Sequence, residues 1–184
     1  DPLSKEDIRF KKELTASELK RAGADKSKNF TVLETMVKLG LKGLVKKVMR
    51  KAPPFCYADF SGEEKEDILN SLVNISHLHT CREEYRLAHD EAVLKNMVSK
   101  DKYPYIPIIL ITHSSKAVIK EIMEFGRTSR PFAVKIEELW QEIMKDYLRY
   151  SKKSLWIQAK KGYHYIHLTE PEIIVESVNR IRHM

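Results

Sequence analysis

The sequence predicts an α/β fold in which a mainly helical region precedes two parallel strands and their helices. Three observations support this prediction: helical periodicity dominates the amino-terminal half, short apolar runs occur at residues 106–112 and 154–159, and a helical pattern follows each run. Strands that alternate with helices favour parallel pairing with right-handed connections. We therefore expect a helical region over residues 1–103 and an α/β segment over residues 104–184.

An amphipathic helix is predicted over residues 30–50, because apolar residues recur there at spacings of three and four. These residues are Phe30, Leu33, Val37, Leu41, Leu44 and Val48, and the other face carries Lys38, Lys42, Lys46, Lys47 and Arg50. Such a helix either packs its apolar face against the protein and exposes its lysines, or lies on a lipid surface. Gly40 and Gly43 predict a bend or break near its middle, since glycine destabilises helices.

Further helices are predicted after the Pro-Pro pair at residues 53–54, which ends the first helix. Ser61 and Glu64 have the spacing of a capping box, in which each side chain bonds the backbone of the other residue. The helix that begins there places Ile68, Leu72 and Ile75 on one face. Another helix is predicted over residues 82–99.

The run at residues 106–112 is β-branched and continuously apolar, which is typical of a strand buried on both faces of a parallel sheet. Helical patterns at residues 115–125 and 136–150 separate it from the second run. Two strands do not make a stable parallel sheet. We therefore expect the missing strands to come from residues before Asp1 or from a partner chain.

The last helix is predicted to begin at a second capping box, formed by Thr169 and Glu172, with Pro171 in its first turn. Its buried stripe is predicted to contain Ile173, Ile174, Val178 and Ile181. The loop between the second strand and this helix carries His164. A histidine in that position can act as a general base facing a cleft.

Composition limits the partners and the compartment. The 184 residues include 33 Lys and Arg against 26 Asp and Glu, a net charge of +7, which attracts anions without specifying nucleic acid. No nucleic-acid partner and no cofactor are expected. Two cysteines, Cys56 and Cys81, favour a reducing compartment, here the cytoplasm. No apolar run reaches the roughly 18 residues of a transmembrane helix, and the first residues lack a signal-peptide pattern. The sequence does not begin with methionine, so we expect a processed product or a piece of a longer polypeptide.

The segment Ala159-Lys160-Lys161-Gly162-Tyr163-His164-Tyr165-Ile166-His167-Leu168-Thr169-Glu170-Pro171-Glu172 resembles the carboxyl-terminal signature of α/β-hydrolases. In that family, a strand leads to the catalytic histidine, an apolar and His-Leu stretch follows, and Pro-Glu opens the final helix. The resemblance is strongest over residues 140–182. It implies the carboxyl-terminal portion of an α/β-hydrolase fold, with a helix-rich cap followed by the last two parallel strands.

The resemblance also implies roles for individual residues. His164 falls on the catalytic histidine, the general base of a serine-type, esterase-like hydrolase, and Tyr163 and Tyr165 flank it as candidates for the lining of a small-molecule substrate pocket. Asp1 falls where some members carry the catalytic acid, because Asp1-Pro2 resembles the end of the strand after the nucleophile helix. The other place for the acid reads Thr112-His113-Ser114-Ser115 and contains no carboxylate.

The family's nucleophile elbow, Gly-x-Ser-x-Gly, does not occur in residues 1–184. A histidine without its serine does not hydrolyse esters at a useful rate. We therefore expect this chain to be catalytically silent alone, and an elbow roughly 30 to 60 residues before Asp1 in its reading frame, a distance judged from one helix and one strand.

Three alternative interpretations remain. Ser114, which follows a predicted strand, offers a rival nucleophile, although it lacks flanking glycines and fits the N-cap of a helix. A metal site would need convergence of His77, His79, Cys81 and His89, and the first two point about 200° apart on a helix, so no metal is expected. The third is a non-catalytic, basic helical module that binds an anionic or lipid partner.

Overall fold

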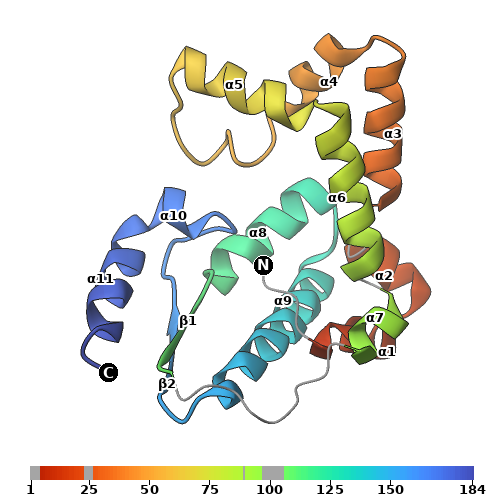
Figure 1. Cartoon of the computed structure of the whole chain (residues 1–184). Coiled ribbons are helices and arrows are strands. Elements are labelled where there is room, and N and C mark those ends of the chain that lie inside the picture. The colour runs from red at the N-terminus through yellow and green to blue at the C-terminus, as the bar shows by residue number, and fades with distance from the viewer. Residues whose placement is uncertain (1–4, 23–26, 89, 97–105) are drawn as a thin grey trace. The chain divides into compact units, whose positions relative to one another are not determined.

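The computed structural model describes residues 5–22, 27–88, 90–96 and 106–184. The chain divides into two compact units, Asp1–Ala24 with Glu91–Met184, here called the α/β unit, and Asp25–Asp90, here called the helical unit. Most described residues are helical, and two strands form a parallel pair, so the general α/β prediction is confirmed (Figure 1). The boundary predicted after residue 103 lies outside the described residues.

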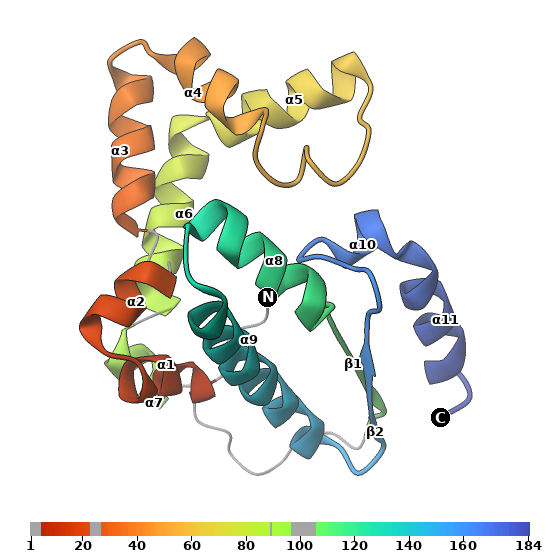
Figure 2. The ribbon, with the colours of Figure 1, turned by 180° about the vertical axis from the view of Figure 1, so that it is seen from behind.

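The sheet of the α/β unit consists of β1 (Ile108–Thr112) and β2 (Ser154–Gln158), with Ile108 opposite Ser154 and Thr112 opposite Gln158. Helices α8 (Ser115–Gly126) and α9 (Arg130–Lys145) lie on one face, and α11 (Pro171–Ile181) lies on the other (Figures 1 and 2). The prediction that the first strand is buried on both faces is wrong for most of it, because only Thr112 is fully buried. With two described strands, the residues of β1 have few neighbours to cover them.

Helix α9 is the centre of the core of the α/β unit. Its Leu139, Ile143 and Met144 form a buried cluster with Leu14, which follows α1 (Ile8–Glu13) and precedes α2 (Ala16–Ala22). Ion pairs border this contact, Arg9 with Glu142 at 2.9 Å and Lys135 with Glu18 at 2.7 Å. The short elements of this unit are η1 (Lys5–Asp7), α7 (Glu91–Asn96), η2 (Asp146–Tyr150) and α10 (Ile166–Thr169).

The helical unit contains α3 (Ser27–Lys38), α4 (Lys42–Met49), α5 (Gly62–Leu72) and α6 (Ile75–Ala88). The predicted break near Gly40 is confirmed, because Gly40 adopts a φ of 81°, which side chains disfavour. The single apolar face predicted over residues 30–50 is wrong beyond this turn. The turn reorients α4, so that Leu44 and Val48 are exposed and Val45 is buried instead.

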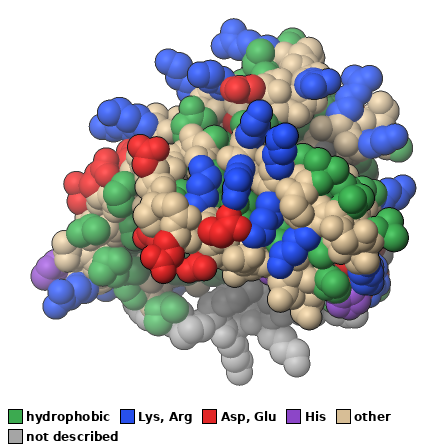
Figure 3. All heavy atoms as spheres, turned by 90° about the horizontal axis from the view of Figure 1, so that it is seen from above, with side chains coloured by type: hydrophobic (Ala, Val, Ile, Leu, Met, Phe, Trp, Pro, Cys, Tyr) green, Lys and Arg blue, Asp and Glu red, His purple; other side chains and the backbone are tan. Residues whose placement is uncertain are grey.

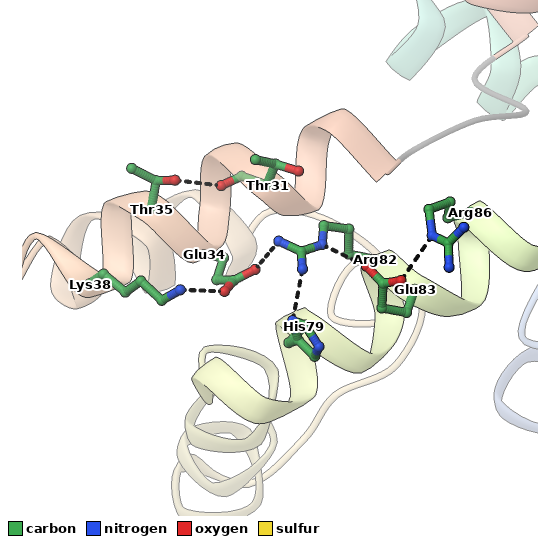
Figure 4. A network of polar contacts seen from close by, with 8 residues as sticks. All are labelled: Thr31, Glu34, Thr35, Lys38, His79, Arg82, Glu83 and Arg86. Atoms are coloured by element: carbon green, nitrogen blue, oxygen red, sulfur yellow. Dashed lines mark hydrogen bonds and ion pairs between the residues drawn. The ribbon is translucent and has the colours of Figure 1, made fainter.

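A polar network joins α3 to α6 (Figure 4). Glu34 is buried and accepts from Lys38 Nζ at 2.6 Å and from Arg82 Nη1 at 2.8 Å. Arg82 also donates to His79 Nδ1 at 2.8 Å. The hydrogen bond from Lys38 and the charge of Arg82 outweigh burial and hold the pKa of Glu34 below its usual range. The network therefore keeps a buried carboxylate ionised between two helices.

The helix boundaries follow local capping chemistry. The predicted capping box is confirmed: Ser61 Oγ accepts from Glu64 N at 3.2 Å, and Glu64 Oε2 accepts from Ser61 N at 2.9 Å. Asn74 then begins a new helix, because its Oδ1 accepts from Ser76 N at 2.9 Å, so α5 does not extend to Ile75. The single helix predicted over residues 82–99 is wrong. Its first part belongs to α6, and α7 begins at Glu91.

Candidate functional site

The carboxyl ends of β1 and β2 lie side by side, and two backbone hydrogen bonds join the loops that follow them. Ala159 N donates to Thr112 O at 2.8 Å, and Ser114 N donates to Gly162 O at 2.8 Å. In α/β proteins with parallel strands, ligands bind at this edge of the sheet. The loop after β2, residues 159–165, is therefore placed where a functional side chain is expected.

A buried carboxylate fixes the course of this loop. Glu170 accepts hydrogen bonds from three consecutive backbone N–H groups, those of Lys160 at 3.2 Å, Lys161 at 2.8 Å and Gly162 at 2.9 Å. Burial alone would raise the pKa of Glu170, but the three N–H bonds outweigh it and hold the pKa below its usual range. The ionised side chain of Glu170 thus closes the loop onto the start of α11.

The second capping box, predicted from Thr169 and Glu172, is wrong. Glu170 occupies the N-cap position of α11, and Thr169 instead accepts from Tyr163 N at 3.2 Å through its Oγ1. Thr169, which the local pattern assigned to the helix start, therefore bonds back to the loop instead. The predicted buried stripe also changes, because Val178 is exposed while Ser177 is buried.

His164 lies on the surface of this loop. Its side chain is exposed, and its ring meets that of Tyr165 edge to face at 5.3 Å between centroids. Tyr165 in turn meets the ring of His167 at 6.0 Å. Tyr163 and Tyr165 are half-buried. The structure thus brings together three of the predicted site residues, whereas Asp1, the predicted acid, lies outside the described residues.

The loop after β1 contains a buried histidine that sequence reasoning did not select. His113 Nε2 lies 2.9 Å from Glu137 Oε2, and the His113 ring stacks on Trp140 at 4.0 Å. Gln141 Nε2 donates to Glu137 Oε1 at 2.8 Å and to the His113 carbonyl at 3.2 Å. The signal that could have revealed this cluster is the pair Glu137 and Gln141, two polar residues on the apolar face of a predicted helix. The cluster joins α9 to the loop that follows β1.

The rival nucleophile Ser114 is buried in this same loop. It occupies the N-cap position of α8, as predicted, but its side chain makes no capping bond. Its backbone is extended, with φ −72° and ψ 115°, and differs from the strained turn of a nucleophile elbow. Ser114 therefore does not face a substrate.

Metal binding receives no support from the described part of the chain, where no group of three His, Cys, Asp or Glu side chains is close enough to hold an ion. Cys81 Sγ lies 3.5 Å from His77 Nε2, His79 bonds Arg82, and His89 lies outside the described residues. Among the same residues, no helix is both long and apolar enough to cross a membrane.

Gly162 is closely packed, so that a side chain there would crowd its neighbours. A Cβ placed there would lie 3.0 Å from Ala159 Cβ and 3.5 Å from Glu170 Oε2. We expect Gly162→Ala to lower the free energy of unfolding by about 1–3 kcal/mol, as overpacking does. Gly43→Ala is the control, because nothing lies within 4 Å of that position in α4, and it is expected to be neutral or stabilising. Denaturant unfolding followed by circular dichroism measures both, and equal effects would contradict the packing account.

Comparison with known proteins adds no relative. No family model matches the chain, and no curated protein or solved structure matches it either.

Proposed function

We propose that the α/β unit supplies the histidine loop of an α/β-hydrolase-type ester hydrolase, with His164 as the general base. The observation that supports this proposal most is an exposed imidazole on a loop that Glu170 fixes, at the carboxyl edge of a parallel strand pair. A general base must be open to the reacting group and held in place. His113, at the same edge, is buried against Glu137 and does not meet the first requirement.

The proposed chemistry is acyl transfer through a serine. His164 takes the proton of the serine hydroxyl as its oxygen attacks the ester carbonyl carbon, and returns that proton to the departing alcohol. Water, deprotonated by the same imidazole, then releases the acid. Asp1 is our candidate for the carboxylate that orients the imidazole. Tyr163 and Tyr165 are candidates for contact with the substrate, and the helical unit for a cap.

Residues 1–184 contain no Gly-x-Ser-x-Gly motif that could supply this serine. We therefore expect the isolated chain to hydrolyse p-nitrophenyl esters no faster than its His164→Ala variant, and to leave serine-directed fluorophosphonates unreacted. Release of p-nitrophenol and mass spectrometry measure the two outcomes. Turnover by the isolated chain that disappears in the variant would contradict this expectation and place the nucleophile within these residues.

A further inference from the structure

Apolar side chains project into solvent around the turn between α3 and α4. We call residues 35–51 the α3–α4 corner. Four of its apolar side chains are more than two-fifths exposed: Leu39 72%, Leu41 43%, Leu44 49% and Val48 63%. Leu41, Leu44 and Val48 follow one another at spacings of three and four, so they share one side of α4. This is an unusual amount of uncovered aliphatic surface in so short a segment.

The same corner is strongly basic, and glutamates outside it pair with only part of its charge. Residues 35–58 contain five lysines and one arginine and no acidic residue. Lys46 and Arg50 both pair with Glu66, and Lys38 pairs with Glu34. The exposed Lys42, Lys47 and Lys51 make no ion pair with any residue that the structure describes. Figure 3 shows Lys and Arg side chains standing beside apolar ones on the face seen from above.

We propose that the α3–α4 corner docks on an anionic phospholipid surface. Exposed leucines and valines on one side of a helix, bordered by lysines, are the pattern of helices that lie in the membrane interface. Lys42, Lys47 and Lys51 attract the anionic headgroups, while Leu41, Leu44 and Val48 enter the boundary of the acyl chains. The inference is independent of the hydrolase proposal, because it uses no residue of the histidine loop.

The geometry of the turn favours a fluid surface over a protein groove. Leu39 and Leu41 flank Gly40 and are both exposed, and a Cβ at Gly40 would meet nothing within 4 Å, so no side chain covers the turn at that position. An apolar tip of this kind can be immersed in lipid without a matching cavity. An acidic protein segment would neutralise the lysines but leave the apolar side chains at the tip in water.

The test is flotation of the 184-residue chain with two kinds of vesicle, phosphatidylcholine alone and phosphatidylcholine mixed with phosphatidylserine. We expect binding to the mixed vesicles only, and weaker binding at high salt. The combined variant Lys42→Ala, Lys47→Ala, Lys51→Ala should bind about a hundredfold more weakly, since each cation near an anionic leaflet contributes about a fivefold gain in affinity. The combined variant Leu41→Ser, Leu44→Ser, Val48→Ser should also lose binding.

Control variants remove exposed lysines or exposed valines from the α/β unit. Lys116→Ala, Lys120→Ala, Lys152→Ala removes three exposed lysines, and Val175→Ser, Val178→Ser removes two exposed valines. Both controls should bind like the parent chain.

An equal loss in the lysine control, equal binding to neutral vesicles, or no binding at low salt would overturn the proposal. So would a dimer that Leu44→Ser dissociates in sedimentation, because a second copy would then cover the corner. Should the serine variant fail to fold, the lysine variants decide.

Discussion

His164→Ala is expected to reduce ester hydrolysis by about 10⁴-fold or more in a longer polypeptide that joins residues 1–184 to a Gly-x-Ser-x-Gly elbow. Without the imidazole, the serine keeps its proton at neutral pH and attacks slowly. The exposed position of His164 makes the substitution mild for the fold, because the side chain is not part of the buried core. The measurement is kcat/KM on p-nitrophenyl esters.

His167→Ala is the matched control, because His167 is also exposed and also meets the ring of Tyr165. It should retain kcat/KM within about threefold, as a surface residue outside the proton transfer does. Circular dichroism of both variants should overlay on that of the parent. If His164→Ala keeps most of its activity and His167→Ala loses it, the base is His167 and not His164.

Glu170→Ala is expected to lower the free energy of unfolding of the α/β unit by about 3 kcal/mol, because three backbone N–H groups lose a charged acceptor. Denaturant unfolding can be followed by tryptophan fluorescence, since Trp140 and Trp156 both belong to this unit. Glu172→Ala, an exposed glutamate two residues further on, should change stability by less than about 0.5 kcal/mol. Equal effects of the two substitutions would contradict the role assigned to Glu170.

The pH dependence of the stability that Glu170→Gln removes gives a signed prediction. Because the pKa of Glu170 is lower in the folded chain, its carboxylate stabilises the fold at neutral pH. That contribution begins to decline as the pH falls to about 4.3, the value of an unfolded glutamate, and is lost once the pH falls through the lower folded pKa. The stability difference between the parent and Glu170→Gln should therefore shrink on acidification. A difference that grows in acid would contradict this sign.

Sequence patterns correctly predicted the features that depend only on neighbouring residues. The capping box of Ser61 and Glu64 needs only the residues that form it, and Gly40 breaks its helix through its own backbone. The first strand was predicted because its run is β-branched and continuously apolar, and the second because a shorter apolar run lies between two helical patterns. Their parallel pairing followed from the helices between them, which leave no short hairpin connection.

Residues that bond across the tertiary structure were not predictable in this way. Thr169 and Glu172 have the spacing of a capping box, yet Thr169 bonds Tyr163, and Glu170, which the pattern ignored, holds the loop. Periodicity likewise placed Leu44 and Val48 on one face with Phe30 and Leu33, because it cannot show in which direction the chain turns at Gly40. Hydrogen-bond partners and buried faces of this kind depend on which elements pack together in the fold. The spacing of residues along the sequence does not contain that information.

The candidate site contains residues that the sequence predicted and residues that it did not. His164 is exposed beside Tyr165, and its role as a base stays a prediction, while the buried cluster of His113, Glu137 and Gln141 was not predicted. Asp1 remains a prediction. A carboxylate partner that comes from a distant segment has no local signature, because only the fold brings it to the imidazole.

The most direct measurement is the rate at which a fluorophosphonate reacts with the elbow serine in the longer polypeptide, with and without His164. This reaction requires the serine to lose its proton and requires no knowledge of the natural substrate. The proposal predicts rapid labelling that becomes slower by orders of magnitude in His164→Ala, and unchanged labelling in His167→Ala. Equally rapid labelling of all three proteins would show that the imidazole at position 164 does not activate the serine.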